Sequence, residues 1–240
     1  MYSISQNKRK FAIIIPVYNH EQGIEDVIVK SLKLNMPVFV IDDGSTDSTH
    51  DKIMNFKNVY TLHHHVNMGK GAAITTGFIE AAKVADWAIT IDADGQHNPE
   101  DALKMIQVIP ENERPIVVGM RENMDGKNVP WASRFGRKFS NFWIVLSGGP
   151  RMADSQSGFR IYPLPESLGL NVIARRFQFE IEILAKAAWN RIPIIEVPVS
   201  VNYASVSERI SHFRPFIDFL RNTWTFTRLI TQRILIRPFV

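Results

Sequence analysis

Trp87-Ala-Ile-Thr-Ile-Asp-Ala-Asp-Gly-Gln-His97 is a mostly apolar run that leads directly into two carboxylates. Its first five residues predict a buried strand. Side chains at positions i and i+2 of an extended segment point the same way, and two adjacent carboxylates repel each other unless a cation lies between them. A divalent ion held by carboxylates commonly completes its shell with substrate phosphates. Asp92 and Asp94 are therefore candidates for a Mg²⁺ or Mn²⁺ site that holds a diphosphate.

A simpler interpretation of the same residues stays open. Acids are common at the ends of strands, and these two could open a turn and cap the helix that begins in Asn98-Pro-Glu-Asp101. The spacing of the two carboxylates alone favours neither interpretation.

The segments around this stretch alternate between predicted strands and predicted helices. The predicted strands are residues 11–17, 36–41, 58–63, 87–91 and 115–119. The predicted helices are residues 21–34, a segment capped by Ser45 or Thr46, 70–84 and 99–109. Such alternation at short spacing is typical of a doubly wound, mostly parallel α/β sheet, in which ligands bind beyond the carboxyl ends of the strands.

The rhythm changes after Gly119. We expect helices over residues 131–146 and 177–190, a short strand after Arg160, and a strand with prolines over residues 192–201. No repeat or low-complexity linker separates this half from the first, so both halves are predicted to belong to one domain that ends near residue 212.

Composition narrows the class of protein. The chain has 240 residues, of which 45% are hydrophobic, and this is enough for a large core. Cysteine is absent, which excludes disulfides and thiolate metal sites. Residues 1–10 lack an apolar segment, and no run of 18 apolar residues occurs. We therefore expect a cytoplasmic protein without a membrane span.

The basic charge lies in the last residues of the chain. Residues 213–240 carry five arginines and one acid, which accounts for the whole net charge of +4. Residues 216–237 are predicted to form an amphipathic helix with Arg214, Arg221 and Arg228 at seven-residue spacing, as expected of a helix that lies on an anionic membrane surface. Docking on the rest of the chain, or a homo-oligomer formed through this helix, is the alternative. The segment lacks lysine and any nucleic-acid-binding motif, so no nucleic acid is expected.

Two common nucleotide-binding motifs are missing. The first strand turns through Pro16-Val-Tyr-Asn-His20, without G-x-G-x-x-G, and the chain has no G-x-x-x-x-G-K-[ST]. Asn67-Met-Gly-Lys-Gly71 could place backbone N–H groups and Lys70 near a phosphate, or it could be an ordinary glycine turn. His63-His-His65 is interpreted as a polar strand end, because consecutive strand residues point to opposite faces and make poor joint ligands.

Taken together, the motifs resemble those of a known family. The sequences Ile-Pro-Val-Tyr-Asn, Ile-Asp-Asp-Gly-Ser-Thr-Asp, Asn-Met-Gly-Lys-Gly and Asp-Ala-Asp-Gly-Gln-His-Asn-Pro-Glu follow in the order seen in family-2 glycosyltransferases of the GT-A fold. Within that family the chain is most similar to the dolichol-phosphate mannose synthase and polyprenyl-phosphate sugar transferase branch. Asp154-Ser-Gln-Ser-Gly-Phe-Arg160 and Phe179-Glu-Ile-Glu182 agree with it. The resemblance covers residues 10–212.

The resemblance implies a division of the chain and a set of site residues. Residues 1–212 would form the GT-A domain, with 10–119 as its nucleotide-sugar-binding half and 120–212 as its acceptor half, and 213–240 the basic C-terminal helix. The nucleoside pocket and donor site would include Pro16, Tyr18, Asp42, Asp43, Lys70, Asp92 and Arg209. The metal would be held by Asp92, Asp94 and Gln96. The residues nearest the reaction would be Asp94, Arg121, Arg134 and Glu180.

Two departures from the branch leave questions open. Its usual Arg-x-x-Gly-x-Ser corresponds only loosely to Ser207-Glu-Arg-Ile-Ser-His-Phe213, which affects the position of Arg209. Glu180 would be a general base if the acceptor were a hydroxyl, or a structural residue otherwise. The expected activity is inverting transfer of a sugar from a UDP- or GDP-sugar to a lipid-linked acceptor, either a polyprenyl phosphate or a glycolipid, at the cytosolic membrane face. The alternative is a nucleotide-sugar-binding protein without turnover.

Overall fold

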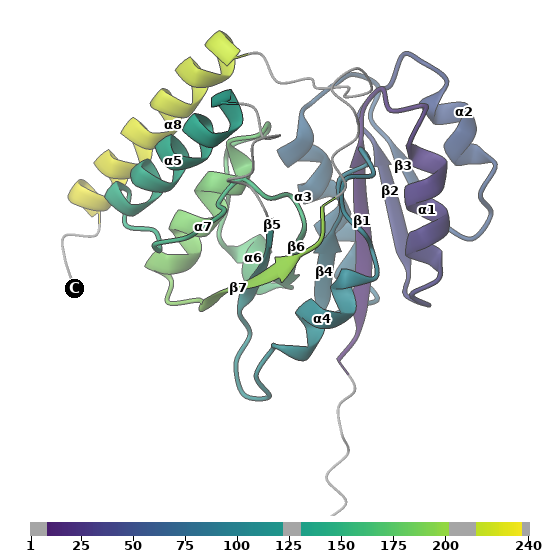
Figure 1. The fold of residues 1–240 in the computed structure, drawn as a ribbon, viewed down its shortest axis with the longest axis horizontal. Coiled ribbons are helices and arrows are strands. Elements are labelled where there is room, and N and C mark those ends of the chain that lie inside the picture. The colour runs from purple at the N-terminus through teal and green to yellow at the C-terminus, as the bar shows by residue number, and fades with distance from the viewer. Residues whose placement is uncertain (1–8, 122–130, 202–214, 237–240) are drawn as a thin grey trace, which may run out of the picture.

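The structure, a computed structural model, describes residues 9–121, 131–201 and 215–236. Within these residues a seven-stranded sheet has the order β3-β2-β1-β4-β6-β5-β7 (Figure 1). The strands are β1 (Phe11–Val17), β2 (Val38–Asp42), β3 (Tyr60–His63), β4 (Trp87–Thr90), β5 (Ile116–Arg121), β6 (Arg160–Pro163) and β7 (Ile194–Val199).

The pairing of the strands confirms a mostly parallel sheet. β1 pairs with β2 and β4, β2 with β3, and β5 with β7, all in parallel. β6 lies antiparallel between β4 and β5, with Ile161 opposite both Ile89 and Val117. The parallel strands therefore direct their carboxyl ends, and the polar residues that follow them, toward one edge of the sheet.

Helices cover both faces of the sheet (Figure 1). One apolar core includes residues of α1 (Ile24–Leu32), α2 (Thr49–Met54) and α4 (Asp101–Gln107). The core on the opposite face includes residues of α3 (Lys70–Ala81), α6 (Glu166–Gly169) and α7 (Phe179–Trp189). Strands that are buried on both faces need apolar side chains at successive positions, which explains the uninterrupted apolar run of β1.

Close packing between α3 and β1 depends on a glycine. A Cβ atom added at Gly77 would lie 2.5 Å from Cγ2 of Ile14, so the helix can approach β1 only because this side chain is missing. This approach fixes the first residue of α3, Lys70, near the carboxyl ends of the central strands.

The expected cap of the second helix is wrong. α2 begins at Thr49 after an N-cap at Ser48, and neither Ser45 nor Thr46 caps it. Instead, the hydroxyl of Ser45 accepts a hydrogen bond from the backbone N–H of Asn19, and Thr46 donates its N–H to the side-chain oxygen of Asn19. Ser45 and Thr46 therefore bond to Asn19 in the loop after β1 and not to the first turn of α2. These hydrogen bonds join the loops that follow β1 and β2.

The C-terminal helix α8 (Pro215–Ile236) lies beside α5 (Trp131–Leu146) and also contacts α7 (Figure 1). The ring of Phe226 is buried and stacks on Trp143 of α5, with 5.7 Å between ring centroids. Arg228 forms an ion pair with the fully buried Glu182 of α7. Because of these contacts, one side of α8 belongs to the packed part of the molecule.

Within the described residues, no helix is both long and apolar enough to cross a bilayer.

Candidate active site

Asp92 and Asp94 follow β4 at the carboxyl edge of the sheet. The chain turns sharply after them at Gly95, whose φ of +69° is a conformation that glycine adopts without strain. The backbone N–H of Gln96 then donates to Oδ1 of Asp94 over 3.0 Å. This turn holds the Asp94 carboxylate beside the end of the strand.

Lys70 lies between two carboxylates from distant parts of the chain. Its Nζ is 2.6 Å from Oδ1 of Asp92 and 2.6 Å from Oε1 of Glu180 in α7. The backbone before Lys70 has φ +104° at Gly69, where an added Cβ would lie 2.5 Å from the carbonyl oxygen of Arg175. Only glycine fits this position, and it starts α3 with the lysine directed at Asp92.

Charge in this cluster is balanced by the lysine. Burial alone would lower the pKa of Lys70, but the charges of Asp92 and Glu180 raise it above its usual value. Burial would likewise raise the pKa of Asp92, and the Lys70 ammonium holds it below its ordinary range. Desolvation and the adjacent charge of Asp92 raise the pKa of Asp94. Asp92 and Asp94 therefore repel each other, and an additional cation between them would relieve this repulsion.

The residues at this edge fit a Mg²⁺ or Mn²⁺ ion. The available donors are carboxylate oxygens, the ligands that these ions prefer. A Cβ at Gly158 would lie 2.3 Å from Oδ2 of Asp92 and 2.5 Å from Nζ of Lys70, so only glycine leaves these groups room. The hydroxyl of Thr90 donates to the carbonyl of Gly158 over 2.7 Å and holds the glycine there.

Arg121 ends β5 and is held by a buried acid. Its Nε and Nη2 donate to the two oxygens of Asp154 over 2.6 and 2.9 Å. Burial would raise the pKa of Asp154, but the hydrogen bond and charge of Arg121 lower it. The carboxylate of Glu196 accepts the N–H groups of Ala153 and Asp154, which fixes this loop against β7. Arg121 is therefore a fixed cation at the same edge as Asp92.

Two other expected arginines lie partly or wholly outside the described part of the structure. Arg134 belongs to α5, but its side chain lies outside the described part of the structure. Arg209 lies outside the described residues altogether. Their places near phosphates stay predictions.

Of the residues expected to contact the nucleoside, Pro16 belongs to β1 and Tyr18 follows that strand. Asp43 is buried, and its carboxylate accepts the N–H groups of Met68 and Gly69 over 2.9 and 2.7 Å. Asp43 thus fixes the turn that precedes Lys70.

Asp42 is fully buried, and its oxygens already have partners. Oδ1 accepts the N–H of Ser45, and Oδ2 lies 3.0 Å from Nδ1 of both His50 and His63. A direct contact between Asp42 and a base would need these bonds to be exchanged.

Neighbouring side chains of the histidine run point in different directions, as expected on a strand. His63 contacts Asp42, whereas the next residue, His64, contacts Asp43, with 2.8 Å between its Nδ1 and the carboxylate. Consecutive histidines therefore serve different acids and do not act as joint ligands.

His97, the last residue of the opening motif, is buried. Its ring lies against Phe159, with 5.2 Å between ring centroids. Burial lowers the pKa of His97 to about 4, so the ring is neutral at pH 7.

Asp154, Gly158 and Arg160 were not predicted as site residues. The buried guanidinium of Arg160 donates to the carbonyl groups of Ser157, Ser155 and Glu180 over 2.7, 2.7 and 2.9 Å. It therefore joins the loop that carries Gly158 to the start of α7. The motif from Asp154 to Arg160 was noted in the sequence, but its contacts with Arg121, Asp92 and Glu180 join distant parts of the chain, and no local pattern indicates them.

Residues 12–164 match the sequence model described as Glycosyl transferase family 2. The chain belongs to this family. A UDP-N-acetylglucosamine–dolichyl-phosphate N-acetylglucosaminyltransferase of Methanococcus voltae is 34% identical over 218 residues, which cover 81% of this chain and 86% of the relative. A dolichol-phosphate mannosyltransferase of Pyrococcus furiosus is 29% identical over 230 residues, 90% of this chain and 63% of the relative.

Solved structures confirm the GT-A fold of this family 2 glycosyltransferase. Glucosyl-3-phosphoglycerate synthase from Mycobacterium tuberculosis, in complex with Mn²⁺, UDP and phosphoglyceric acid, has a TM-score of 0.67 and 20% identity. The similarity covers 94% of this chain and 78% of that protein.

Proposed function

We propose that this family 2 glycosyltransferase transfers a sugar from a UDP- or GDP-sugar to a polyprenyl phosphate, with inversion at the anomeric carbon. The observation that carries the proposal is the meeting of Asp92, Asp94 and Lys70 at the carboxyl edge of the sheet. The names of the Methanococcus and Pyrococcus relatives support the class of acceptor.

In this proposal Asp92 and Asp94, with Gln96, hold a Mg²⁺ or Mn²⁺ ion. When bound, the ion supplies positive charge that stabilises the leaving nucleoside diphosphate. Lys70 and Arg121 add two protein cations at the same edge. The bond between the anomeric carbon and the diphosphate oxygen breaks with its electron pair on the diphosphate. The acceptor oxygen forms the new bond from the opposite side, which inverts the configuration.

The ion pair of Glu180 favours a phosphate acceptor. A phosphate monoester is already ionised at neutral pH and needs no general base, whereas a hydroxyl does. Glu180 is nearly buried and lies 2.6 Å from Nζ of Lys70, a position suited to holding the lysine. We therefore assign Glu180 the role of positioning Lys70.

The nucleoside is assigned to the end of β1. Pro16 and Tyr18 are proposed to contact it directly. Asp42 and Asp43 are proposed to shape the pocket by fixing the backbone at Ser45 and Gly69.

The lipid part of the acceptor requires access from a membrane. Support comes from the outward sides of α5 and α8, which expose Phe142, Leu146, Trp224 and Leu235. We place the protein on the cytosolic face of the membrane, with these side chains in the lipid. The competing arrangement is a homo-oligomer that buries the same side chains of α8.

A transfer assay tests the proposal. Purified protein is incubated with dolichyl or undecaprenyl phosphate in detergent, Mn²⁺ and each of several UDP- and GDP-sugars. A glycosylated lipid is expected with at least one donor, and EDTA or Asp94→Asn should reduce its formation by at least about a hundredfold. Glu111→Gln, an exposed acid between α4 and β5, is the control that retains activity. Donor binding without product would instead indicate a nucleotide-sugar-binding protein without turnover.

A further inference from the structure

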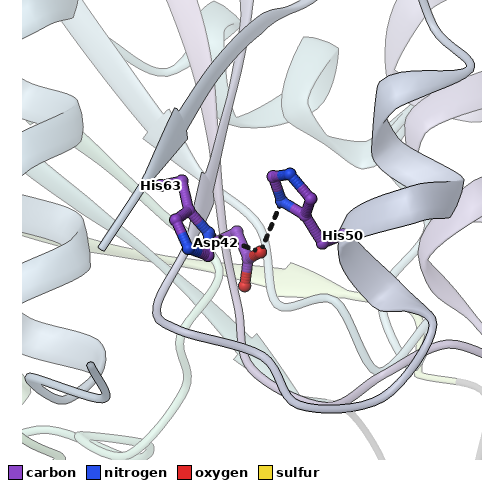
Figure 2. Close-up of side chains that lie close together, drawn as sticks. All are labelled: Asp42, His50 and His63. Carbon is purple, nitrogen blue, oxygen red and sulfur yellow. Dashed lines mark hydrogen bonds and ion pairs between the residues drawn. The ribbon is translucent and has the colours of Figure 1, made fainter. Parts of the chain in front are cut away.

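Three potential metal ligands meet near the carboxyl ends of β2 and β3, two strands away from β4 and the Asp92–Asp94 pair. Figure 2 shows Asp42, His50 and His63 directed toward one another. Oδ2 of Asp42 lies 3.0 Å from Nδ1 of His50 and 3.0 Å from Nδ1 of His63. One ligand atom of each residue lies within 4.8 Å of the other two.

The three side chains come from three elements that fix them independently. Asp42 and His63 are directly paired residues of β2 and β3. His50 belongs to the first turn of α2. The N–H of Ser45 holds Oδ1 of Asp42 over 2.9 Å, which leaves Oδ2 directed at both imidazoles. A group that orients a metal-binding carboxylate in this way is typical of preformed sites.

We propose that Asp42, His50 and His63 bind a divalent transition-metal ion, with Zn²⁺ as the best fit. Two imidazole nitrogens and one carboxylate oxygen are a common Zn²⁺ ligand set, completed by water in the fourth position. In a tetrahedral site with bonds of about 2.0 Å, ligand atoms lie ~3.3 Å apart. The two distances from Asp42 to the imidazoles are 3.0 Å and all three ligand atoms lie within 4.8 Å of one another, so shifts of the two half-exposed rings would close the site. Each neutral imidazole frees Nδ1 for the metal by carrying its proton on Nε2.

Access and exposure favour the same assignment. Asp42 is fully buried, but both histidine side chains are 37% exposed, so an ion can reach the nitrogens from solvent. A hollow of about 640 Å³ lies beside α2 and β3, with His50 and His63 in its wall and Lys57 among the residues that line it. The hollow leaves room for the fourth ligand.

This ligand set differs from the carboxylate pair in chemistry and in position. Asp92 and Asp94 offer oxygen atoms, which suit Mg²⁺ or Mn²⁺, whereas imidazole nitrogens favour Zn²⁺, Co²⁺ or Ni²⁺. Asp42 is the last residue of β2 and Asp92 follows β4, with β1 between the two strands. An ion bound at Asp42 would link the outermost strand β3 to its neighbour β2 and to α2. Binding should therefore stabilise the packing of β3 and α2 on the rest of the sheet.

Cobalt spectroscopy on the full chain, with any polyhistidine tag removed, tests the site. Co²⁺ bound to two imidazoles and a carboxylate in a tetrahedral arrangement should give visible absorption bands that one equivalent of Zn²⁺ abolishes. His50→Ala and His63→Ala should each weaken binding by at least about tenfold. His65→Ala, which removes an exposed neighbouring ring, and Asp94→Asn should both retain the bands.

Each outcome of the cobalt experiment either supports or contradicts the proposed metal site. Bands that survive both His50→Ala and His63→Ala, or that disappear in Asp94→Asn alone, would place the ion elsewhere and overturn the proposal. Absence of bands in the unmodified protein, with no rise of melting temperature in Zn²⁺, would show that the three residues form hydrogen bonds only. Because His50 lies on a helix surface, His50→Ala keeps the test valid if His63→Ala does not fold; circular dichroism checks both.

Discussion

Lys70 is the residue on which the charge balance of the candidate site depends. Removing its ammonium by Lys70→Met would leave Asp92 and Glu180 without their shared cation in a largely desolvated place. Breaking such a pair costs about 3–5 kcal/mol of the free energy of unfolding, which urea denaturation at pH 7 measures. Adding Glu180→Gln should recover at least about 1 kcal/mol by removing one unpaired charge.

The matched control is Lys83→Met, which removes a lysine that pairs with Glu80 on the exposed side of α3. Its cost should stay below about 1 kcal/mol, as for other exposed ion pairs. If the two lysine variants lost equal stability, or if the double variant were no better than Lys70→Met, Lys70 would not be balancing these carboxylates.

Gly158 gives a second prediction at the level of one residue. The added methyl group of Gly158→Ala would lie against the Asp92 carboxylate and the Lys70 ammonium, so both would have to move. Transfer should fall by about a hundredfold, because catalysis is sensitive to displacements of an ångström. Gly169→Ala is the control, since its Cβ meets no atom within 4 Å. Retained activity in Gly158→Ala would show that Asp92 can shift without loss.

What the sequence predicts about single residues depends on how far apart their partners lie. Asp92 and Asp94 could be predicted because the strand and its carboxylates are adjacent in the chain. The contact between Lys70 and Glu180 joins residues 110 positions apart, and periodicity carries no information about such a pair. The same limit applies to His63, whose partners Asp42 and His50 come from other elements.

Among the elements, α7 and α8 are joined by Glu182. This fully buried carboxylate accepts the N–H groups of Ile173 and Ala174 and pairs with Lys186 and Arg228. Burial would raise the pKa of Glu182, but hydrogen bonds from Lys186 and the backbone lower it. A lowered pKa in the folded state means that ionisation stabilises folding above the ordinary pKa of 4.5, and that this stability is lost as the pH falls through the folded-state value.

We therefore expect Glu182→Gln to reduce the free energy of unfolding by about 3–5 kcal/mol at pH 7. The difference from the unmodified protein should shrink as the pH falls below 4.5, since the unfolded chain then binds a proton that the folded carboxylate does not, and it should be lost once the pH falls through the lower folded-state pKa. Urea denaturation between pH 7 and 3.5 measures it. Glu80→Gln, in an exposed pair, should cost less than about 1 kcal/mol. A pH-independent loss would exclude the charge of Glu182 as the cause.

Helices and strands were predicted well where their apolar residues form a continuous local pattern. The apolar run of β1 and the pattern of α3 are local signals, and the structure has both elements close to their expected bounds. The antiparallel position of β6 between β4 and β5 depends on pairing with strands more than 40 residues earlier in the chain, which a strand pattern alone does not contain.

For the whole molecule, the arrangement of α8 bears on the proposed access to a lipid-linked acceptor. Its seven-residue arginine spacing predicts a basic face, but Arg228 pairs with Glu182 and Arg233 donates to the carbonyl of Leu146. These two guanidinium groups are directed at the protein. We therefore expect membrane binding to depend mainly on the apolar side chains that α5 and α8 expose, with a smaller contribution from anionic lipid.

Deleting α8 would not be a clean test of membrane binding. Truncation after His212 would remove the buried Phe226, whose ring packs on Phe139 and Trp143 of α5, together with the buried Leu229, and should destabilise the remaining chain. Substitutions on the exposed side avoid this difficulty, because they leave the packed side of α8 unchanged.

The combined variant Trp224→Ser and Leu235→Ser should reduce flotation with phosphatidylglycerol-containing vesicles by at least about tenfold. Transfer of an apolar side chain of this size from water into lipid contributes roughly 1.5–3 kcal/mol to binding. Both side chains are more than 70% exposed, at 72% and 73%, so the fold should be unaffected. Val84→Ser, an exposed apolar residue after α3, is the control. Unchanged flotation of the double variant, together with conversion of a dimer to a monomer in light scattering, would instead identify this surface as a subunit interface.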